Sequence, residues 1–346
     1  MFGMIERTGK EESMKHKGRV IWLGLCCILL ATGCTQTEST VRGFAMDTVT
    51  AITVYKKEDE KAAQAALNKL EEWETEWSAD REDSVVYRIN HGQTETVSQS
   101  TMEMLHLGQR LETQTQGAYT LAVRPLVELW HINDRTAEEP LPEQTEIEQA
   151  KSLCGQANLT IQPLENGSGC VAVQEGAGVD LGSVAKGKAA ELLKAYLQDQ
   201  GVQDALIDLG GNICTVGDST YEIGIQDPRN GQSILALLKV QGKSVVTSGD
   251  YQRYVEIGQT RYHHILDART GWPADSGLIS VTIVGEDSMV CDALSTAVFL
   301  VGEQKGLELV KAYGVEAVLV NEDKQVLVTD GLKDSFTLQG RDYTLQ

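Results

Sequence analysis

Strand-like and helix-like segments follow one another in mixed order along the 346 residues, and this order limits the folds open to the chain. β-branched and aromatic runs indicate strands, whereas apolar residues at helical spacing indicate helices. We expect strands at 48–55, 179–181, 205–209, 221–225, 233–240, 279–284, 317–320 and 325–328, and helices at 59–77, 101–115, 184–197, 287–301 and 303–313. Residues 138–149 favour a surface loop or a short helix. The order predicts an α+β fold with mixed, mainly antiparallel sheets and packed helices.

The composition excludes several classes of protein. Acidic residues outnumber basic ones by 50 to 30, so the net charge of −20 repels phosphate polymers, and we expect no nucleic-acid partner. A hydrophobic content of 41% supports a substantial core and excludes disorder as the main state. No apolar run reaches the roughly 20 residues that a membrane-spanning helix needs, which excludes a polytopic membrane protein.

Residues 1–33 have the pattern of an export signal, because basic residues at 7–19 precede the apolar segment Val20–Thr32. The sequence around Cys34 resembles a bacterial lipobox, although Ala31 replaces the usual aliphatic residue three positions before the cysteine. We expect a lipid (palmitate) on Cys34, a polar tether at 34–42 and a folded domain at 43–346, extracytoplasmic and lipid-anchored to the bacterial cell membrane. The alternative is an uncleaved N-terminal anchor in which Cys34 is an ordinary thiol.

Four further cysteines stand in the predicted domain, namely Cys154, Cys170, Cys214 and Cys291. They show no CxxC or other metal-like spacing. An oxidising compartment permits a disulfide between Cys154 and Cys170, but the spacing does not require one. We treat all four as structural.

Residues 178–187 (GVDLGSVAKG) place an acid after a short apolar segment, small residues in a turn and Lys186 in the first turn of a helix. Backbone N–H groups at a helix start attract anions, and Gly182 and Gly187 would let a ligand approach closely. This pattern indicates a phosphate site. Gly-rich turns of this kind also occur where they only allow close packing, so the motif alone does not establish a phosphate site.

Residues 262–271 (YHHILDARTG) hold two of the six histidines of the chain beside an acid and an arginine. In an extended segment His263 and His264 point to opposite faces, so only one would reach a given site. His264 is a candidate general base with a pKa near the working pH. A hydrogen-bonded structural histidine is the alternative for either ring.

Asp292 and Thr296 lie four residues apart in an expected helix and therefore share a face. A carboxylate and a hydroxyl together suit Mg²⁺, which takes oxygen ligands and often completes its shell with substrate phosphates. An Asp-x-x-x-Thr pair is also common by chance. The polar segment 246–251 (VTSGDY) is equally ambiguous by itself.

Taken in order, these segments resemble the ApbE family of FAD:protein FMN transferases over about residues 44–302. The resemblance is carried by Met46-Asp47-Thr48, Asp83-Ser84, Arg88-Ile89-Asn90, Gly117-Ala118-Tyr119, Pro125-Leu126, Trp130, Asp180, Leu209-Gly210-Gly211-Asn212, Thr247 to Tyr251, His263 to Gly271, Asp292 and Thr296. It implies an ApbE-like (T-fold-like) architecture. It also implies Mg²⁺-dependent transfer of FMN from FAD, the substrate, to a Thr or Ser hydroxyl of an exported redox protein, with release of AMP.

The resemblance also implies roles for single residues. FAD would contact Met46, Ala118, Tyr119, Thr120, Asp180, Lys186 and Ile265; Mg²⁺ would be held by Ser183, Asp292, Ser295 and Thr296; His264 and Lys186 would serve catalysis. Three positions depart from the family pattern. Thr120 stands where a carboxylate is expected near the flavin, Asp80 where many relatives carry an aromatic residue, and Ala268 where proline is common.

Two other functions fit the same residues. With water as the acceptor, the site would act as a Mg²⁺-dependent FAD pyrophosphatase that yields FMN and AMP. Without catalysis, the chain would be an exported flavin-binding lipoprotein. The sequence does not separate these from transfer.

Overall fold

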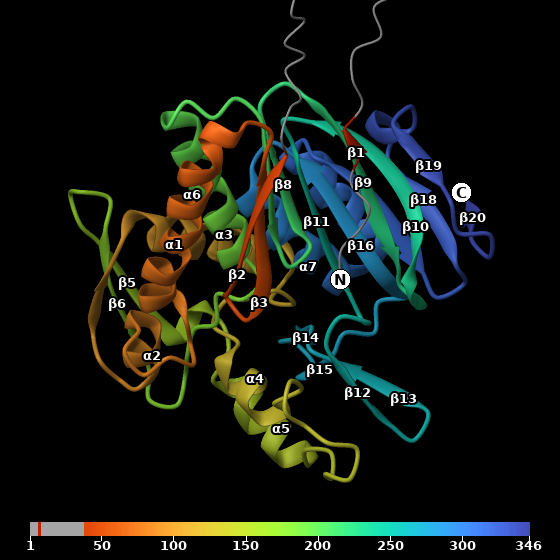
Figure 1. The fold of residues 1–346 in the computed structure, drawn as a ribbon. Coiled ribbons are helices and arrows are strands. Elements are labelled where there is room, and N and C mark those ends of the chain that lie inside the picture. Colours follow the sequence, from red (N-terminus) through yellow and green to blue (C-terminus); the bar gives the residue numbers. More distant parts are fainter. Residues whose placement is uncertain (1–5, 8–37) are drawn as a thin grey trace, which may run out of the picture.

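The computed structural model describes residues 6–7 and 38–346, and its main feature is a nine-stranded sheet (Figure 1). In spatial order the sheet contains β2 (Ser39–Ala45), β3 (Thr48–Val54), β7 (Ala205–Leu209), β8 (Asn212–Val216), β11 (Ser244–Gly249), β16 (Leu278–Gly285), β17 (Glu316–Asn321), β18 (Gln325–Val328) and β20 (Thr344–Leu345). All neighbours pair antiparallel except β18 and β20. The predicted α+β fold with mainly antiparallel sheets is confirmed.

Helices cover one face of this sheet. They are α1 (Glu60–Trp77), α3 (Gln99–Gln114), α6 (Ala185–Asp199) and α7 (Ser288–Tyr313), and they share an apolar core with the sheet. A smaller sheet covers the other face, with the order β1 (Glu6–Arg7), β9 (Thr220–Asp227), β10 (Asn230–Gln241) and β19 (Phe336–Leu338). Strand alternation divides the side chains between the two cores: Leu319 of β17 packs toward the helices and Val318 toward the smaller sheet.

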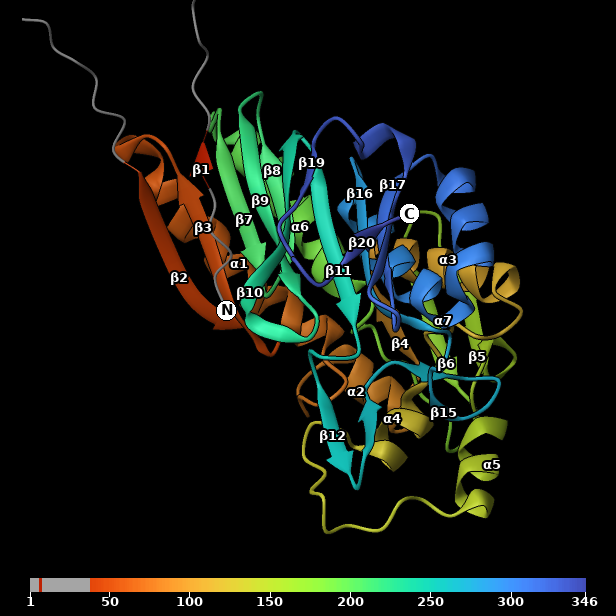
Figure 2. The same ribbon diagram turned by 90° about the vertical axis from the view of Figure 1, so that its right-hand side faces the viewer.

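The remaining elements lie at one end of these layers, as Figure 2 shows from the side. They are α2 (Val85–Asn90), β4 (Glu95–Val97), α4 (Arg124–Trp130), α5 (Gln144–Ser152), β5 (Leu159–Pro163), β6 (Gly169–Val173), β12 (Tyr254–Ile257), β13 (Thr260–His263), β14 (Leu266–Asp267) and β15 (Trp272–Pro273). The 3₁₀ turns are η1 (Lys57–Asp59), η2 (Gln156–Asn158) and η3 (Asp330–Leu332). A third apolar cluster, which includes Trp130, Ile147 and Val255, joins α4 and α5 to β12.

Most expected elements are confirmed within a few residues, and two differences have clear causes. Residues 179–181 are extended but not a strand, because the N–H of Val179 donates to the Asn90 side chain and that of Asp180 to the Leu121 carbonyl. The expected tether at 34–42 overlaps β2, which begins at Ser39 because this residue already pairs with Val54. The helices expected at 287–301 and 303–313 are present as α7, which is broken at Gly302 by its φ of 80°.

The expected lipidation site Cys34 lies outside the described residues, and so does the expected export signal except for Glu6–Arg7, which form β1. Within the described part of the chain, no helix is both long and apolar enough to span a bilayer. Cys154 and Cys170 are free thiols, so the disulfide that the compartment permits is not formed. Cys214 and Cys291 are buried.

Candidate active site

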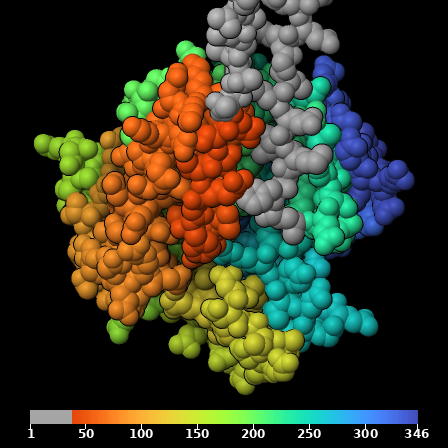
Figure 3. Space-filling model, viewed as in Figure 1, coloured from red at the N-terminus to blue at the C-terminus, as the bar shows by residue number. Residues whose placement is uncertain are grey.

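A cavity of about 1660 Å³ opens at the end of the large sheet. Its walls come from the β2–β3 turn, the loop before α6, the loop after β11, the residues around His264 and the first half of α7. Figure 3 shows the outer surface of this face, where the α4–α5 region lies beside β12 and β13. Segments far apart in the sequence therefore meet around one space.

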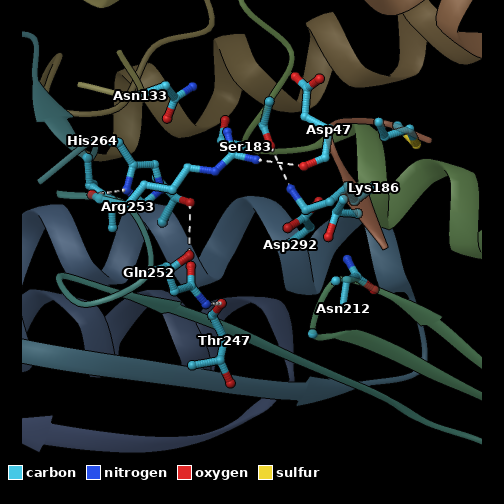
Figure 4. Close-up of a pocket in the computed structure, with 18 of the residues that line it drawn as sticks. Asp47, Asn133, Ser183, Lys186, Asn212, Thr247, Gln252, Arg253, His264 and Asp292 are labelled. Carbon is cyan, nitrogen blue, oxygen red and sulfur yellow. Dashed lines mark hydrogen bonds between the residues drawn. The ribbon is translucent and has the colours of Figure 1, made fainter. Parts of the chain in front are cut away.

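The structure brings together ten of the twelve predicted site residues. Met46, Tyr119, Thr120, Asp180, Ser183, Lys186, His264, Ile265, Asp292 and Thr296 all line the cavity. Ala118 and Ser295 do not line it: Ala118 is buried behind Tyr119, and Ser295 is buried within α7. Figure 4 shows Ser183, Lys186 and Asp292 close to one another, with His264 on the opposite wall.

The corner at 178–187 is held together by its own polar groups. Asp180 accepts a hydrogen bond from the N–H of Gly182 at 2.9 Å, and Lys186 Nζ donates to the Gly182 carbonyl at 3.0 Å. Arg124 Nη1 also donates to Asp180 at 3.5 Å, while Nη2 of the same residue pairs with Asp80 at 2.6 Å. Asp80, one of the departures from the family pattern, thus belongs to an ion-pair network at the cavity wall.

Gly187 has a different role from the one expected of it. A Cβ at this position would lie 2.3 Å from the Ser288 carbonyl oxygen and 2.6 Å from Asp292 Cβ. Glycine is therefore required for the close approach of α7 to α6, rather than for access of a ligand. Because the helices touch here, the N–H of Gly187 donates to Asp292 Oδ2 at 2.7 Å. Asp292 satisfies one of the amides that the first turn of α6 leaves without a partner.

Asp292 keeps one carboxylate oxygen available. Its side chain is 4% exposed, and Oδ1 makes no hydrogen bond to any residue that the structure describes. Tyr119 lies near this carboxylate. Burial raises the pKa of its phenol, and the negative charge of Asp292 raises this pKa further. The Tyr119 hydroxyl pairs with Ser183 Oγ at 3.0 Å. Carboxylate and hydroxyl oxygens thus gather at the corner.

Thr120 replaces the expected carboxylate, but its side chain contacts an acidic residue, Glu112. The Thr120 hydroxyl donates to Glu112, which also accepts hydrogen bonds from the backbone N–H of Gln156 at 2.9 and 3.0 Å. Thr120 lines the cavity, whereas Glu112 does not. The negative charge therefore lies one layer farther from the cavity than the family pattern implies.

The two adjacent histidines diverge as expected. His263 is buried, with Nε2 at 3.0 Å from the Ala274 carbonyl and its ring edge-on to Phe299. His264 faces the cavity, and its Nδ1 lies 3.2 Å from the carbonyl of Arg253. Because a carbonyl only accepts, Nδ1 carries the proton and Nε2 has a free lone pair.

The pKa expectation for His264 is wrong. Burial, together with the positive charges of Arg253 and Lys186, lowers its pKa to about 3 rather than leaving it near the working pH. The ring is neutral at pH 7. It can accept a hydrogen bond through Nε2, but it is a weak base in the ligand-free protein.

Sequence reasoning missed the contact between Arg253 and the β2–β3 turn. Arg253 Nη2 donates to the Asp47 carbonyl at 3.3 Å, across 206 positions of the chain. Met46 and Asp47 both have positive φ, 54° and 56°, and the N–H of Met46 donates to Glu74. Backbone strain of this kind concentrates at functional sites. No local motif indicated Arg253, because only the fold brings it to the turn.

The residues present fit a hard cation. Among the described residues no cluster of three His, Cys, Asp or Glu side chains exists, so a metal held only by such groups is not supported. Asp292 and Thr296 carry oxygen atoms that can bind a metal, and both residues line the same cavity as Ser183. Mg²⁺ accepts so sparse a set when substrate phosphates complete its shell. A dication would also make the carboxylates of Asp180 and Asp292 compatible with an anionic ligand.

Solved structures with this fold include ApbE proteins and flavin transferases. The ApbE protein of Thermotoga maritima superposes with a TM-score of 0.76 at 29% identity and covers 85% of this chain and 98% of its own. The flavinyl transferase ApbE of Pseudomonas stutzeri gives a TM-score of 0.71 at 28% identity, with 83% and 92% covered. The FAD:protein FMN transferase of Treponema pallidum is 32% identical over 340 residues, which are 90% of this chain and 93% of the relative.

Residues 46–319 match the model of the ApbE family. The chain belongs to this family, as its ordered motifs predicted. A FAD:protein FMN transferase from Klebsiella pneumoniae is also 32% identical, over 78% of this chain and 85% of its own length.

Proposed function

We propose that this protein transfers FMN from FAD to a threonine or serine hydroxyl of an exported redox protein and releases AMP. The observation that carries the proposal is the bond between Asp292 and the N–H of Gly187, which joins α7 to the 178–187 corner at one cavity. The cavity exceeds the roughly 300–1000 Å³ of common small-ligand sites, which suits a dinucleotide together with an acceptor segment.

The reaction exchanges one phosphate bond for another. The acceptor oxygen forms a bond to the FMN phosphorus, and the bond from that phosphorus to the bridging oxygen breaks. The bridging oxygen leaves with AMP, and the proton of the acceptor hydroxyl passes to the phosphate of AMP or to solvent. Such transfers depend mainly on positioning and on neutralisation of phosphate charge.

The residues of the chain divide these tasks. Asp292, Thr296 and Ser183 would hold Mg²⁺, which supplies positive charge to the diphosphate. Lys186 would face the same anion, since it lines the cavity at this corner, whereas the amides of Ala185 and Gly187 already donate to the Leu181 carbonyl and to Asp292. Met46, Tyr119 and Ile265, which line the cavity, would offer apolar surface to the flavin. His264 Nε2 would accept a hydrogen bond from an incoming hydroxyl.

The proposal includes the location of the enzyme. An export signal at 1–33 and lipid on Cys34 would place the domain outside the cytoplasm, at the membrane surface. Labelling cells with a radioactive fatty acid tests this anchor. Cys34→Ser is expected to abolish the label and to release the protein from membranes.

Incubation with FAD, Mg²⁺ and an acceptor domain tests the activity. Transfer predicts covalent flavin fluorescence on the acceptor and a mass increase equal to one FMN phosphoester. Free FMN formed at the same rate without acceptor would instead favour the pyrophosphatase. Asp292→Ala should abolish AMP release, and unchanged AMP release in this variant would contradict both enzymatic functions.

A further inference from the structure

Three hydroxyl groups form a chain beside the proposed cation site. Ser295 Oγ donates to the carbonyl oxygen of Asp292 at 2.7 Å. Ser248 Oγ lies 2.7 Å from Ser295 Oγ and 3.2 Å from Thr296 Oγ1. Ser248 belongs to β11, whereas the other residues belong to α7, so the chain links a strand of the large sheet to the helix.

The direction of each hydrogen bond follows from the number of protons. A hydroxyl has one proton to donate and two lone pairs that accept. The proton of Ser295 is committed to the Asp292 carbonyl, so Ser248 must donate to Ser295. The proton of Ser248 is then used, and Thr296 must donate to Ser248. All three bonds run one way, from Thr296 to the backbone of Asp292.

This direction fixes the Thr296 hydroxyl for a cation. A neutral hydroxyl binds a metal through an oxygen lone pair, with its proton turned away. Ser248 takes up that proton, and the lone pairs of Thr296 remain for the cavity that the residue lines. Without Ser248, the threonine hydroxyl would turn toward another acceptor, such as the carbonyl four residues earlier, and the lone pairs would turn with it.

We propose that Ser248 is a positioning residue that holds Thr296 in the orientation required to bind a divalent cation, with Ser295 as the link to the backbone. The inference rests on the metal site of the proposed function. It gives Ser295 a supporting role instead of the ligand role expected for it, in agreement with its complete burial and its absence from the cavity wall.

Direct binding of Mn²⁺ to the full-length chain, followed by electron paramagnetic resonance in the presence of FAD, tests the proposal. Ser248→Ala is expected to weaken Mn²⁺ binding about 5- to 10-fold, the effect of one lost hydrogen bond. Ser248→Thr retains the hydroxyl and should bind Mn²⁺ within about twofold of the wild type. In AMP-release assays, Ser248→Ala should require more Mg²⁺ for half-maximal rate and approach the wild-type rate at saturation.

Ser244→Ala is the matched control, because Ser244 is a buried serine on the same face of β11 but lies away from the cavity. It should leave Mn²⁺ binding unchanged. Ser295→Ala provides a second test, since it frees Ser248 to donate to Thr296 and should also weaken binding. If Ser248→Ala or Ser295→Ala binds Mn²⁺ as the wild type does, while Asp292→Ala does not, the positioning role is overturned and the metal site stands. If Asp292→Ala also binds normally, the metal site itself is overturned.

Discussion

Asp292 Oδ2 and the amide nitrogen of Gly187 are 2.7 Å apart, although 105 positions separate the two residues in the sequence. The contact needs a residue without a side chain on α6, since any Cβ would enter the backbone of α7. It places a buried carboxylate beside the corner that also holds Lys186. The packing of α6 against α7 therefore also brings Asp292 into the candidate site.

Gly187→Ala should damage both stability and activity. The added methyl group meets a carbonyl oxygen that cannot move alone, so we expect a loss of about 1–3 kcal/mol in the free energy of unfolding. Displacement of α7 should also abolish AMP release from FAD. Urea unfolding and an AMP assay measure the two effects. Gln198→Ala, an exposed change in the same helix, should alter neither; a stable and active Gly187→Ala would contradict the role given to this contact.

His264 should make the ligand-free protein less stable in acid. Its pKa is lowered to about 3 in the folded state by burial and nearby positive charge, against about 6.5 when unfolded. The unfolded chain therefore binds the proton first, and stability present above pH 6.5 is lost as the pH falls toward 3.

His264→Gln should reduce this loss without abolishing it, because burial also lowers the pKa of His263. Urea midpoints of both proteins at pH 7.5 and pH 4.5 provide the measurement. Equal losses in wild type and variant would show that the His264 pKa is not lowered.

Asp47→Gly should stabilise the β2–β3 turn. Asp47 has a φ of 56°, a conformation that glycine adopts without strain, and its carbonyl remains available to Arg253. We expect a gain of about 0.5 kcal/mol after the entropy cost of glycine. Asp59→Gly, at a φ of −84°, should instead lose about 0.5–1 kcal/mol. Urea unfolding measures both changes. A lower free energy of unfolding for Asp47→Gly would argue against backbone strain at position 47.

Thr120→Asp, which introduces the carboxylate of the family pattern, should destabilise this chain by about 1–3 kcal/mol. The new charge would face Glu112, to which the Thr120 hydroxyl now donates. Adding Glu112→Gln should restore much of the loss, so the two changes are coupled. Unfolding free energies of both single variants and the double variant give the coupling. Additive effects would show that the two positions do not interact.

Local pattern and motif order predicted much of this molecule. Strands such as β17 and β18 and helices such as α1 follow from alternation or helical spacing within a few residues. The motifs that carried the family resemblance also supply part of the cavity wall, including Met46, Asp180, His264 and Asp292. The strand predicted at 179–181 is absent because the backbone there donates hydrogen bonds to Asn90 and Leu121, which are distant in sequence.

Other features depend on the fold and were beyond sequence reasoning. Arg253 reaches Asp47 only because the loop after β11 lies beside the β2–β3 turn. The low pKa of His264 follows from its burial and its neighbours, not from its own motif. The sequence indicates that Gly187 allows a close approach, and this is correct. The group that approaches it is helix α7, however, and not a ligand.

The break at Gly302 leaves the cavity-facing half of α7, which carries Asp292 and Thr296, separate from the half that ends at Tyr313. Asp292 and Thr296 are synthesised only after most of the chain, and Asp292 follows its α6 partner Gly187 by 105 positions. The proposed FAD site is therefore completed late in synthesis. Loading with flavin should therefore report completed folding and discriminate against truncated products.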